Sequence, residues 1–94
     1  MFNRILNAIR DKVRSRQYVM TLHAEEEMDD DDLSIFDIES GILTGKITER
    51  QKDVTSSEAK YVVRGQTLLG DDIFVVGKLG PTGKLVIITV YREY

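Results

Sequence analysis

The single histidine of the sequence, His23, is the natural candidate for proton transfer near neutral pH. Glu27 follows four residues later, and this spacing places both side chains on one face of a helix. A carboxylate in that position can orient the imidazole for acid–base catalysis. The same pair can also form a helix-surface hydrogen bond worth a few tenths of a kcal/mol. The spacing therefore leaves a catalytic role and a structural role open.

A metal-ion site is the second chemistry that these residues suggest. His23 with Glu26 or Glu27 gives two ligands on one helix, and the sequence has no second histidine and no cysteine to complete a transition-metal site. The aspartates at positions 29–32 lack the spaced ligands and the glycine of a calcium-binding loop. We therefore expect a solvated acidic corner, with no metal ion and no cofactor.

Phosphate binding is a third chemistry, and it would use side chains from the C-terminal half. Strand alternation puts Arg64 and Lys78 on the same face of neighbouring strands, where together they could bind a phosphate group. Tyr91 lies near the end of the last predicted strand. The glycines of this region fall in predicted strands and turns rather than in a phosphate-binding loop, and no serine stands in a nucleophile elbow.

Composition and charge limit the classes of protein to which this chain can belong. The chain has 94 residues, 41% hydrophobic and 31% charged, which is typical of a single globular domain over residues 1–94. The net charge of −3 is uneven: residues 1–16 carry +4, residues 25–39 carry −9 with no basic residue, and residues 46–94 carry +2. An acidic average argues against nonspecific nucleic-acid binding through a broad basic surface. The absence of cysteine, of a signal-peptide pattern and of a long apolar run predicts a cytoplasmic protein of bacterial type, without a membrane segment.

Apolar residues recur at helical spacing in the N-terminal half and predict three helices. The first is amphipathic, covers roughly residues 2–15 and has a basic outer face. The second runs from about residue 22 to residue 30, with Thr21 as its N-cap and the aspartate run at its end. The third runs from about residue 35 to residue 44. Ser34 and Asp37 form a capping signature at its start, and Gly45 is expected to end it in the left-handed conformation.

An alternating pattern replaces the helical one after Gly45 and predicts four antiparallel strands, at 46–52, 61–67, 73–79 and 84–92. A loop at 53–58 and turns at 68–72 and 80–83 join them, and Pro81 and Gly83 fit a type I turn followed by a left-handed residue. The β-prone segment 18–21 is either a brief edge strand or an extended link. The expected fold class is α+β, with the N-terminal helices packed on a four-stranded antiparallel sheet.

The last three strands are apolar on both faces. Strict alternation in the final strand places Leu85, Ile87, Thr89 and Tyr91 on one face and Val86, Ile88 and Val90 on the other. A small sheet with two apolar faces needs cover on both. Either the helices wrap both sides, or one side is covered by a second copy of the chain or by another protein.

Four segments of the sequence resemble the bacterial domain of unknown function 4258: His23-Ala24-Glu25-Glu26-Glu27-Met28, the Gly45-Lys46-Ile47 break, Tyr61-Val62-Val63-Arg64-Gly65 and Thr89-Val90-Tyr91. The resemblance covers about residues 17–92 and leaves the first helix, residues 1–16, outside it. That group is similar to RelE- and BrnT-type toxins, which are small α+β ribonucleases neutralised by an antitoxin protein. The resemblance implies helices on one side of an antiparallel sheet, RNA as substrate and an antitoxin as partner. Relatives usually carry arginine at the position of Glu27 and another base just downstream, where this chain has acids.

Two functional interpretations are compatible with these residues. In the first, which rests on the resemblance, the protein is a metal-independent endoribonuclease of a toxin–antitoxin system. His23, held by Glu27, would move the proton of an attacking 2′-hydroxyl. Arg64 and Lys78 would stabilise the phosphorane charge, and Tyr91 would position the RNA or donate a proton. In the second interpretation the protein is a non-catalytic regulatory module derived from the same fold, which binds a second copy or another protein through its apolar sheet face.

Overall fold

Three helices and five strands make up the described part of the chain, which a computed structural model covers over residues 2–52 and 58–93. In chain order they are α1 (Asn3–Arg14), β1 (Tyr18–Met20), α2 (Leu22–Asp30), α3 (Ile35–Thr44), β2 (Lys46–Lys52), β3 (Ala59–Gln66), β4 (Asp72–Leu79) and β5 (Leu85–Arg92). The α+β class and the three predicted helices are confirmed. The four predicted C-terminal strands are found within two residues of their predicted ends. Most of the predicted loop, residues 53–57, lies outside the described residues.

The sheet has five strands in the order β1-β5-β4-β3-β2, so the prediction of a four-stranded antiparallel sheet was wrong. The added strand is β1, which pairs in parallel with the start of β5, from Tyr18 opposite Leu85 to Met20 opposite Ile87. The other three pairings are antiparallel. The β-prone residues at 18–21 left an edge strand and an extended link open, because the pairing partner lies at the far end of the chain and local sequence does not indicate it.

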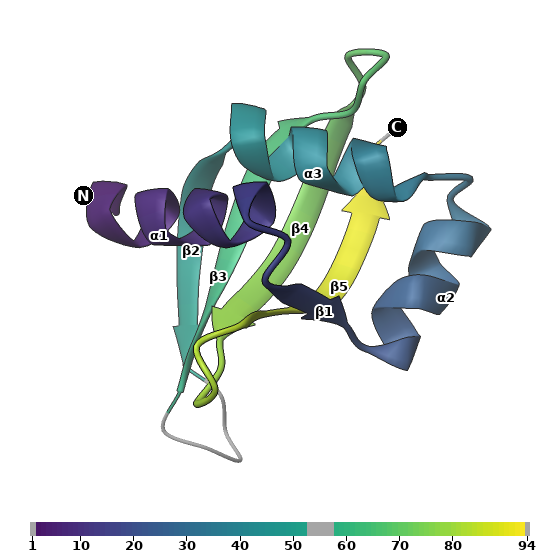
Figure 1. Ribbon diagram of the computed structural model, residues 1–94. Coiled ribbons are helices and arrows are strands. Elements are labelled where there is room, and N and C mark those ends of the chain that lie inside the picture. The colour runs from purple at the N-terminus through teal and green to yellow at the C-terminus, as the bar shows by residue number, and fades with distance from the viewer. Residues whose placement is uncertain (1, 53–57, 94) are drawn as a thin grey trace.

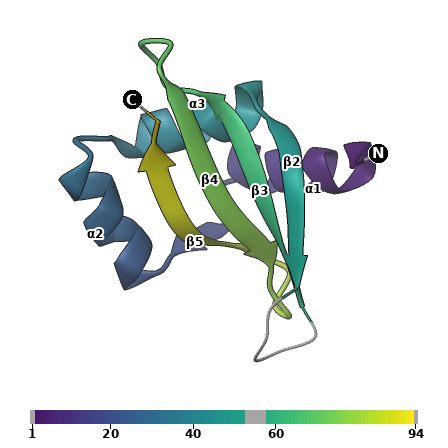
Figure 2. The ribbon, with the colours of Figure 1, turned by 180° about the vertical axis from the view of Figure 1, so that it is seen from behind.

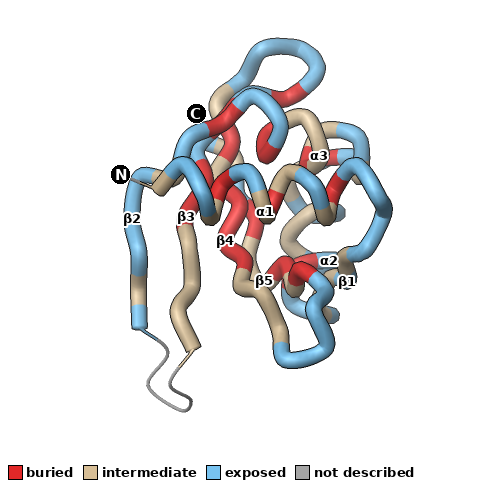
Figure 3. Tube along the Cα trace, turned by 60° about the vertical axis from the view of Figure 1, so that its left-hand side comes forward, coloured by how far each residue is buried: buried red, intermediate tan, exposed pale blue. Residues whose placement is uncertain are grey.

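The helices α1 and α3 lie side by side on one face of the sheet, while α2 lies at its β1–β5 edge (Figure 1). None of the helices formed by residues 2–52 and 58–93 lies on the other face (Figure 2). The core lies between α1, α3 and the sheet, and the buried positions follow β4, β5 and the helix sides that face them (Figure 3). Its largest fully buried side chains are Ile9, Ile38, Ile42, Ile73, Leu85, Ile87, Val75 and Val90. None of the helices formed by the described residues is long and apolar enough to cross a membrane.

Capping residues explain where α2 and α3 begin and where α2 ends. The Thr21 hydroxyl accepts a hydrogen bond from the amide of Ala24 at 3.1 Å, and Ser34 and Asp37 form the predicted capping box. At the end of α2, Asp32 takes a positive φ of 56°, and the amide of Leu33 donates to the Met28 carbonyl at 2.9 Å. This is a Schellman ending with an aspartate at the left-handed position. The aspartate run therefore ends α2 by backbone geometry as well as by charge repulsion.

The end of α3 differs from the prediction. Gly45 has a φ of −90° and a ψ of 177°, which is extended backbone, so the expected left-handed stop was wrong. A Cβ added at Gly45 would lie 2.5 Å from the Gly41 carbonyl oxygen, and one at Gly65 only 1.9 Å from the same atom. The glycines are needed because α3 crosses β3 with backbone against backbone. This close crossing sets the position of β3, and with it the position of Arg64.

A β-bulge in β5 changes which side chains point to which face. Val76 pairs with Thr89, but the next residue, Gly77, pairs with Ile87, so Ile88 is an extra residue in β5. Leu85, Ile87 and Val90 are consequently buried on the helix side, and Tyr91 is 41% exposed on the opposite face. The predicted grouping of Tyr91 with Leu85 and Ile87 was therefore wrong beyond position 88. Periodicity alone cannot show a one-residue insertion that shifts the alternation.

Candidate functional site

Arg64, Phe74 and Tyr91 form a row across the helix-free face of the sheet. Arg64 is directly opposite Phe74 on the neighbouring strand, and Phe74 is directly opposite Tyr91 on the next. The two rings are stacked, with centroids 4.8 Å apart and planes 8° from parallel. The Arg64 guanidinium carbon lies 5.6 Å from the centre of the Phe74 ring, within cation–π range. We call these three side chains the aromatic–arginine row.

The guanidinium of Arg64 is held by acidic neighbours. Its Nη2 donates to an oxygen of Asp72 at 3.0 Å, and a Glu93 oxygen lies 3.9 Å away. The hydrogen bond to Asp72, together with the nearby negative charges, raises the pKa of Arg64 above its ordinary value. The arginine is therefore fixed in place over the Phe74 ring. A phosphate arriving at this site has to compete with Asp72 for the same donor.

Lys46 is a second basic residue at this end of the sheet, and nothing in its sequence context marked it as a candidate. It is exposed and lies directly opposite Arg64 on β2. Both side chains line a shallow groove together with Thr44, Thr48, Gly65, Gln66 and Asp72. The sequence alone could not show that Lys46 is opposite Arg64, because Thr48 is a bulge residue that shifts the register between β2 and β3.

Lys78 occupies the same face as Arg64, as the alternation predicted, but the two residues are not brought together. Arg64 is opposite Phe74, and Lys78 lies four positions further along β4, about 13 Å away at the usual rise of a strand. Its ammonium group is 3.6 Å from an oxygen of Glu58. Lys78 therefore belongs to the other end of this face.

His23 and Glu27 form the predicted pair on α2. The Nε2 atom of His23 lies 3.1 Å from Oε1 of Glu27, and the imidazole is 67% exposed while the carboxylate is 26% exposed. The same Oε1 accepts a hydrogen bond from the backbone amide of Val90 at 3.3 Å. One carboxylate oxygen thus joins the imidazole to β5, next to Tyr91 in the chain. Glu27 therefore contacts the imidazole and binds the backbone of β5 through the same oxygen.

The edge of β5 explains part of the acidic character of α2. β1 pairs only with residues 85–87 of β5, which leaves the following backbone amides at the sheet edge without a strand partner. Glu27 accepts from the amide of Val90, and Asp31 accepts from that of Arg92 at 3.0 Å. Carboxylates that cover an exposed edge satisfy its donors and block pairing with another strand. Acids thus serve the fold at positions where the family resemblance led us to expect bases.

Three of the five residues selected from the sequence lie around the C-terminal half of β5: His23 and Glu27 at its edge, and Tyr91 on its helix-free face. Arg64 is on the same face two strands away, on β3, and Lys78 is at the other end of that face. The arrangement offers a solvent-exposed imidazole held by a carboxylate, a stacked ring pair, and a guanidinium with Lys46 opposite. It can stack a planar ring, bind an anion and exchange a proton.

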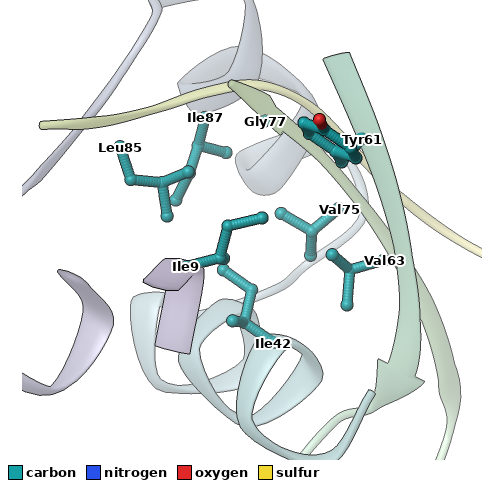
Figure 4. A pocket seen from close by; sticks show the side chains of 8 residues that line it. All are labelled: Ile9, Ile42, Tyr61, Val63, Val75, Gly77, Leu85 and Ile87. Atoms are coloured by element: carbon teal, nitrogen blue, oxygen red, sulfur yellow. The ribbon is translucent and has the colours of Figure 1, made fainter. Parts of the chain in front are cut away.

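The described part of the chain has a core cavity that is too small to be a second binding site, and it has no cluster of metal-binding side chains. A cavity of about 10 Å³ lies inside the core, and the side chains that line it are hydrocarbon apart from the hydroxyl group of Tyr61 (Figure 4). It is too small for a ligand larger than one water molecule, and its apolar walls offer a water no partners. Within residues 2–52 and 58–93, no three histidine, aspartate or glutamate side chains converge as a metal site requires.

The fold and the site define an α+β domain with helices on one face of a mixed sheet and an aromatic–arginine row on the other. The model of a family described as a domain of unknown function, DUF4258, matches residues 20–92, and the chain belongs to this family. The predicted family membership is confirmed, and α1 lies outside the matched segment. Neither a curated protein nor a solved structure matches the chain.

Proposed function

We propose that this protein is an RNA-acting domain of the RelE/BrnT toxin type, a metal-independent endoribonuclease that binds single-stranded RNA on the helix-free face of its sheet. The observation that carries the proposal is the aromatic–arginine row. Exposed aromatic rings on an open sheet are the usual platform for unstacked RNA bases, and a neighbouring guanidinium can hold the phosphate between them. Tyr91 would stack a base on one side of its ring, since Phe74 on the neighbouring strand covers the other side.

The chemistry that suits these residues is attack by the RNA itself. The 2′-hydroxyl loses its proton to the His23 imidazole and attacks the adjacent phosphorus, and the bond from phosphorus to the 5′-oxygen of the next nucleotide breaks. The products are a 2′,3′-cyclic phosphate and a free 5′-hydroxyl, which takes up a proton. Glu27 holds the imidazole during the transfer. In this proposal Arg64 and Lys46, which are opposite each other on β3 and β2, would bind the phosphate and stabilise the phosphorane charge, the role first predicted for Arg64 and Lys78.

The test is cleavage of a fluorescently labelled single-stranded RNA in the presence of EDTA. We expect the wild-type protein to cut it and the His23→Ala variant to lose about 100-fold or more in rate while still binding it, because a general base typically contributes that much. Glu26→Ala, on the exposed side of the same helix, is the matched control and should cut normally. Cleavage that survives both His23→Ala and Arg64→Ala would remove these residues from the mechanism.

A second candidate function is a non-catalytic binding module, and one observation favours it. The acids of α2, with Asp72 and Glu93 around Arg64, make the approach to the site negative, which disfavours a polyanion. In this alternative the stacked rings would bind an apolar side chain of a second copy or of another protein. Sedimentation analysis at high protein concentration distinguishes the binding module from the enzyme. A dimer that is lost in Tyr91→Ala supports the module, whereas a monomer that cuts RNA supports the enzyme.

A further inference from the structure

The helix α3 has two apolar stripes rather than one. Its inner stripe, which includes Ile38 and Ile42, is fully buried against the sheet. An outer stripe carries Phe36, which is 58% exposed, and Leu43, which is 37% exposed and lies two turns further along the same face. A helix that only covers a core is polar on its outer side. The outer stripe of α3 is therefore unexplained by the fold.

The turn between β3 and β4 adds two more exposed leucines beside this stripe. Leu68 is 67% exposed and Leu69 is 89% exposed. The turn is nevertheless firmly held: the amide of Leu68 donates to Asp37 at 3.1 Å, and the amide of Asp71 donates to the hydroxyl of the buried Thr67 at 3.1 Å. Apolar side chains held in place by ordered backbone lose little freedom when they are covered, which favours binding.

The stripe and the turn enclose a shallow groove, which we call the α3–turn groove. Its lining consists of Phe36, Glu39, Ser40, Leu43, Thr44 and Leu68. The groove is on the side of the sheet that α3 covers, whereas the aromatic–arginine row is on the opposite face. Figures 1 and 2 show these two faces of the sheet. The groove shares Thr44 with the groove beside Arg64 but includes no residue of the row.

The charge around the groove indicates what would occupy it. Glu39 lines the groove, Asp37 binds the amide of Leu68 beside it, and Asp71 follows in the turn, whereas neither the lining residues nor the turn at 67–72 includes a base. A second copy that used the same groove would bring the same acids against these, which is unfavourable. The basic α1 of a second copy is unsuitable as well, because its apolar side chains Leu6, Ile9 and Val13 are buried on its own sheet. The complementary occupant has apolar anchors flanked by lysine or arginine.

We propose that the α3–turn groove binds a basic amphipathic helix of a partner protein. Helices bind to apolar grooves through anchors spaced at i, i+3 or i+4, and i+7. Here Phe36 and Leu43 would contact such anchors from one side and Leu68 from the other. Lysine or arginine on the flanks of the partner helix would face Glu39, Asp37 and Asp71.

A synthetic peptide of about 15 residues, roughly four helical turns, serves as the probe. It carries leucines at i, i+3, i+4 and i+7 and lysine or arginine at most other positions, and a control peptide has glutamate in place of each base. Binding to the isotope-labelled full chain is followed by amide chemical shifts. We expect the basic peptide to shift residues of α3 and of the 67–70 turn, and the acidic peptide to shift none.

Variants of the groove complete the test. Phe36→Ser and Leu68→Ser should each weaken the basic peptide at least about tenfold, since a buried apolar anchor commonly contributes this much or more. Leu22→Ser is the matched control, because Leu22 is 71% exposed but lies outside the groove, and it should bind as the wild type does. The proposal is overturned by equal binding of both peptides, by shifts confined to the open sheet face, or by a chain that dimerises through the groove. It is also overturned if the basic peptide does not bind.

Discussion

The carboxylate of Glu27 closes the exposed edge of β5 by accepting the backbone amide of Val90 at 3.3 Å, while it also holds His23. This contact joins the candidate catalytic histidine to the strand that carries Tyr91. It also explains why an acid is useful at a position where the resemblance led us to expect arginine. An arginine offers only donors and could not satisfy the amide of Val90.

Removing the Glu27 carboxylate should destabilise the fold. We expect Glu27→Ala to lower the free energy of unfolding by about 1 kcal/mol, because the amide of Val90 loses its acceptor. Glu27→Gln keeps an acceptor oxygen and should lose less. Glu26→Ala, one residue away and exposed, should change stability by less than about 0.5 kcal/mol. Urea unfolding measures all three, and equal stability of Glu27→Ala and Glu26→Ala would show that the edge contact contributes nothing.

Freeing Arg64 from Asp72 should strengthen RNA binding. Asp72→Asn removes the closer of the two charged partners of the guanidinium and leaves Glu93, so we expect affinity for single-stranded RNA to rise roughly two- to fivefold, the scale of a surface ion pair. Asp30→Asn changes the net charge by the same amount on α2 and is the control. Similar gains in both variants would mean that overall charge, and not release of Arg64, is responsible.

The junction between α3 and the β3–β4 turn should be sensitive to acid. The amide of Ser34 lowers the pKa of Asp37 most, and the amide of Leu68 lowers it further. Because the folded pKa is below the unfolded value, the contribution of Asp37 is present above roughly pH 4 and is lost as the pH falls through the folded pKa. Urea unfolding from neutral to acid pH should show a smaller acid loss in Asp37→Asn than in the wild type. Parallel curves for the two proteins would contradict this.

The contribution of the contact between Tyr18 and Glu39 should be lost only in alkali. Burial, followed by the hydrogen bond to Glu39, raises the pKa of Tyr18 to about 12. The folded pKa exceeds the unfolded value of about 10, so this contribution is complete below about pH 10 and is lost as the pH rises towards about 12. A tyrosinate absorbance titration should show a late step that Tyr18→Phe lacks. Persistence of that step in the variant would assign it to another tyrosine.

Local patterns were sufficient for most elements and insufficient wherever the fold depends on pairing between distant segments. Thr21, Ser34 and Asp37 marked helix starts because a cap acts on its own next few amides. The parallel pairing of β1 and the extra residue Ile88 depend on contacts between strands, and alternation does not encode them.

The same limit applied to the candidate site. His23 and Glu27 were found as a pair because they are one helical turn apart. Arg64 and Lys78 were correctly placed on one face, but their positions along the strands required the register. Neither Phe74 nor Lys46 was predicted as a site residue, because the sequence does not show that they flank Arg64 on adjacent strands.

The most direct test of RNA binding on the open face is an anisotropy titration of a labelled single-stranded RNA of about eight nucleotides, within the length that one small domain covers. Wild-type protein should bind it, and Tyr91→Ala should bind about tenfold or more weakly, because base–aromatic stacking contributes about 1–3 kcal/mol per base. The corresponding RNA duplex, whose bases are already stacked, should bind more weakly than the single strand. No binding by the wild type, or equal binding by Tyr91→Ala, would contradict the proposal that this sheet face binds RNA.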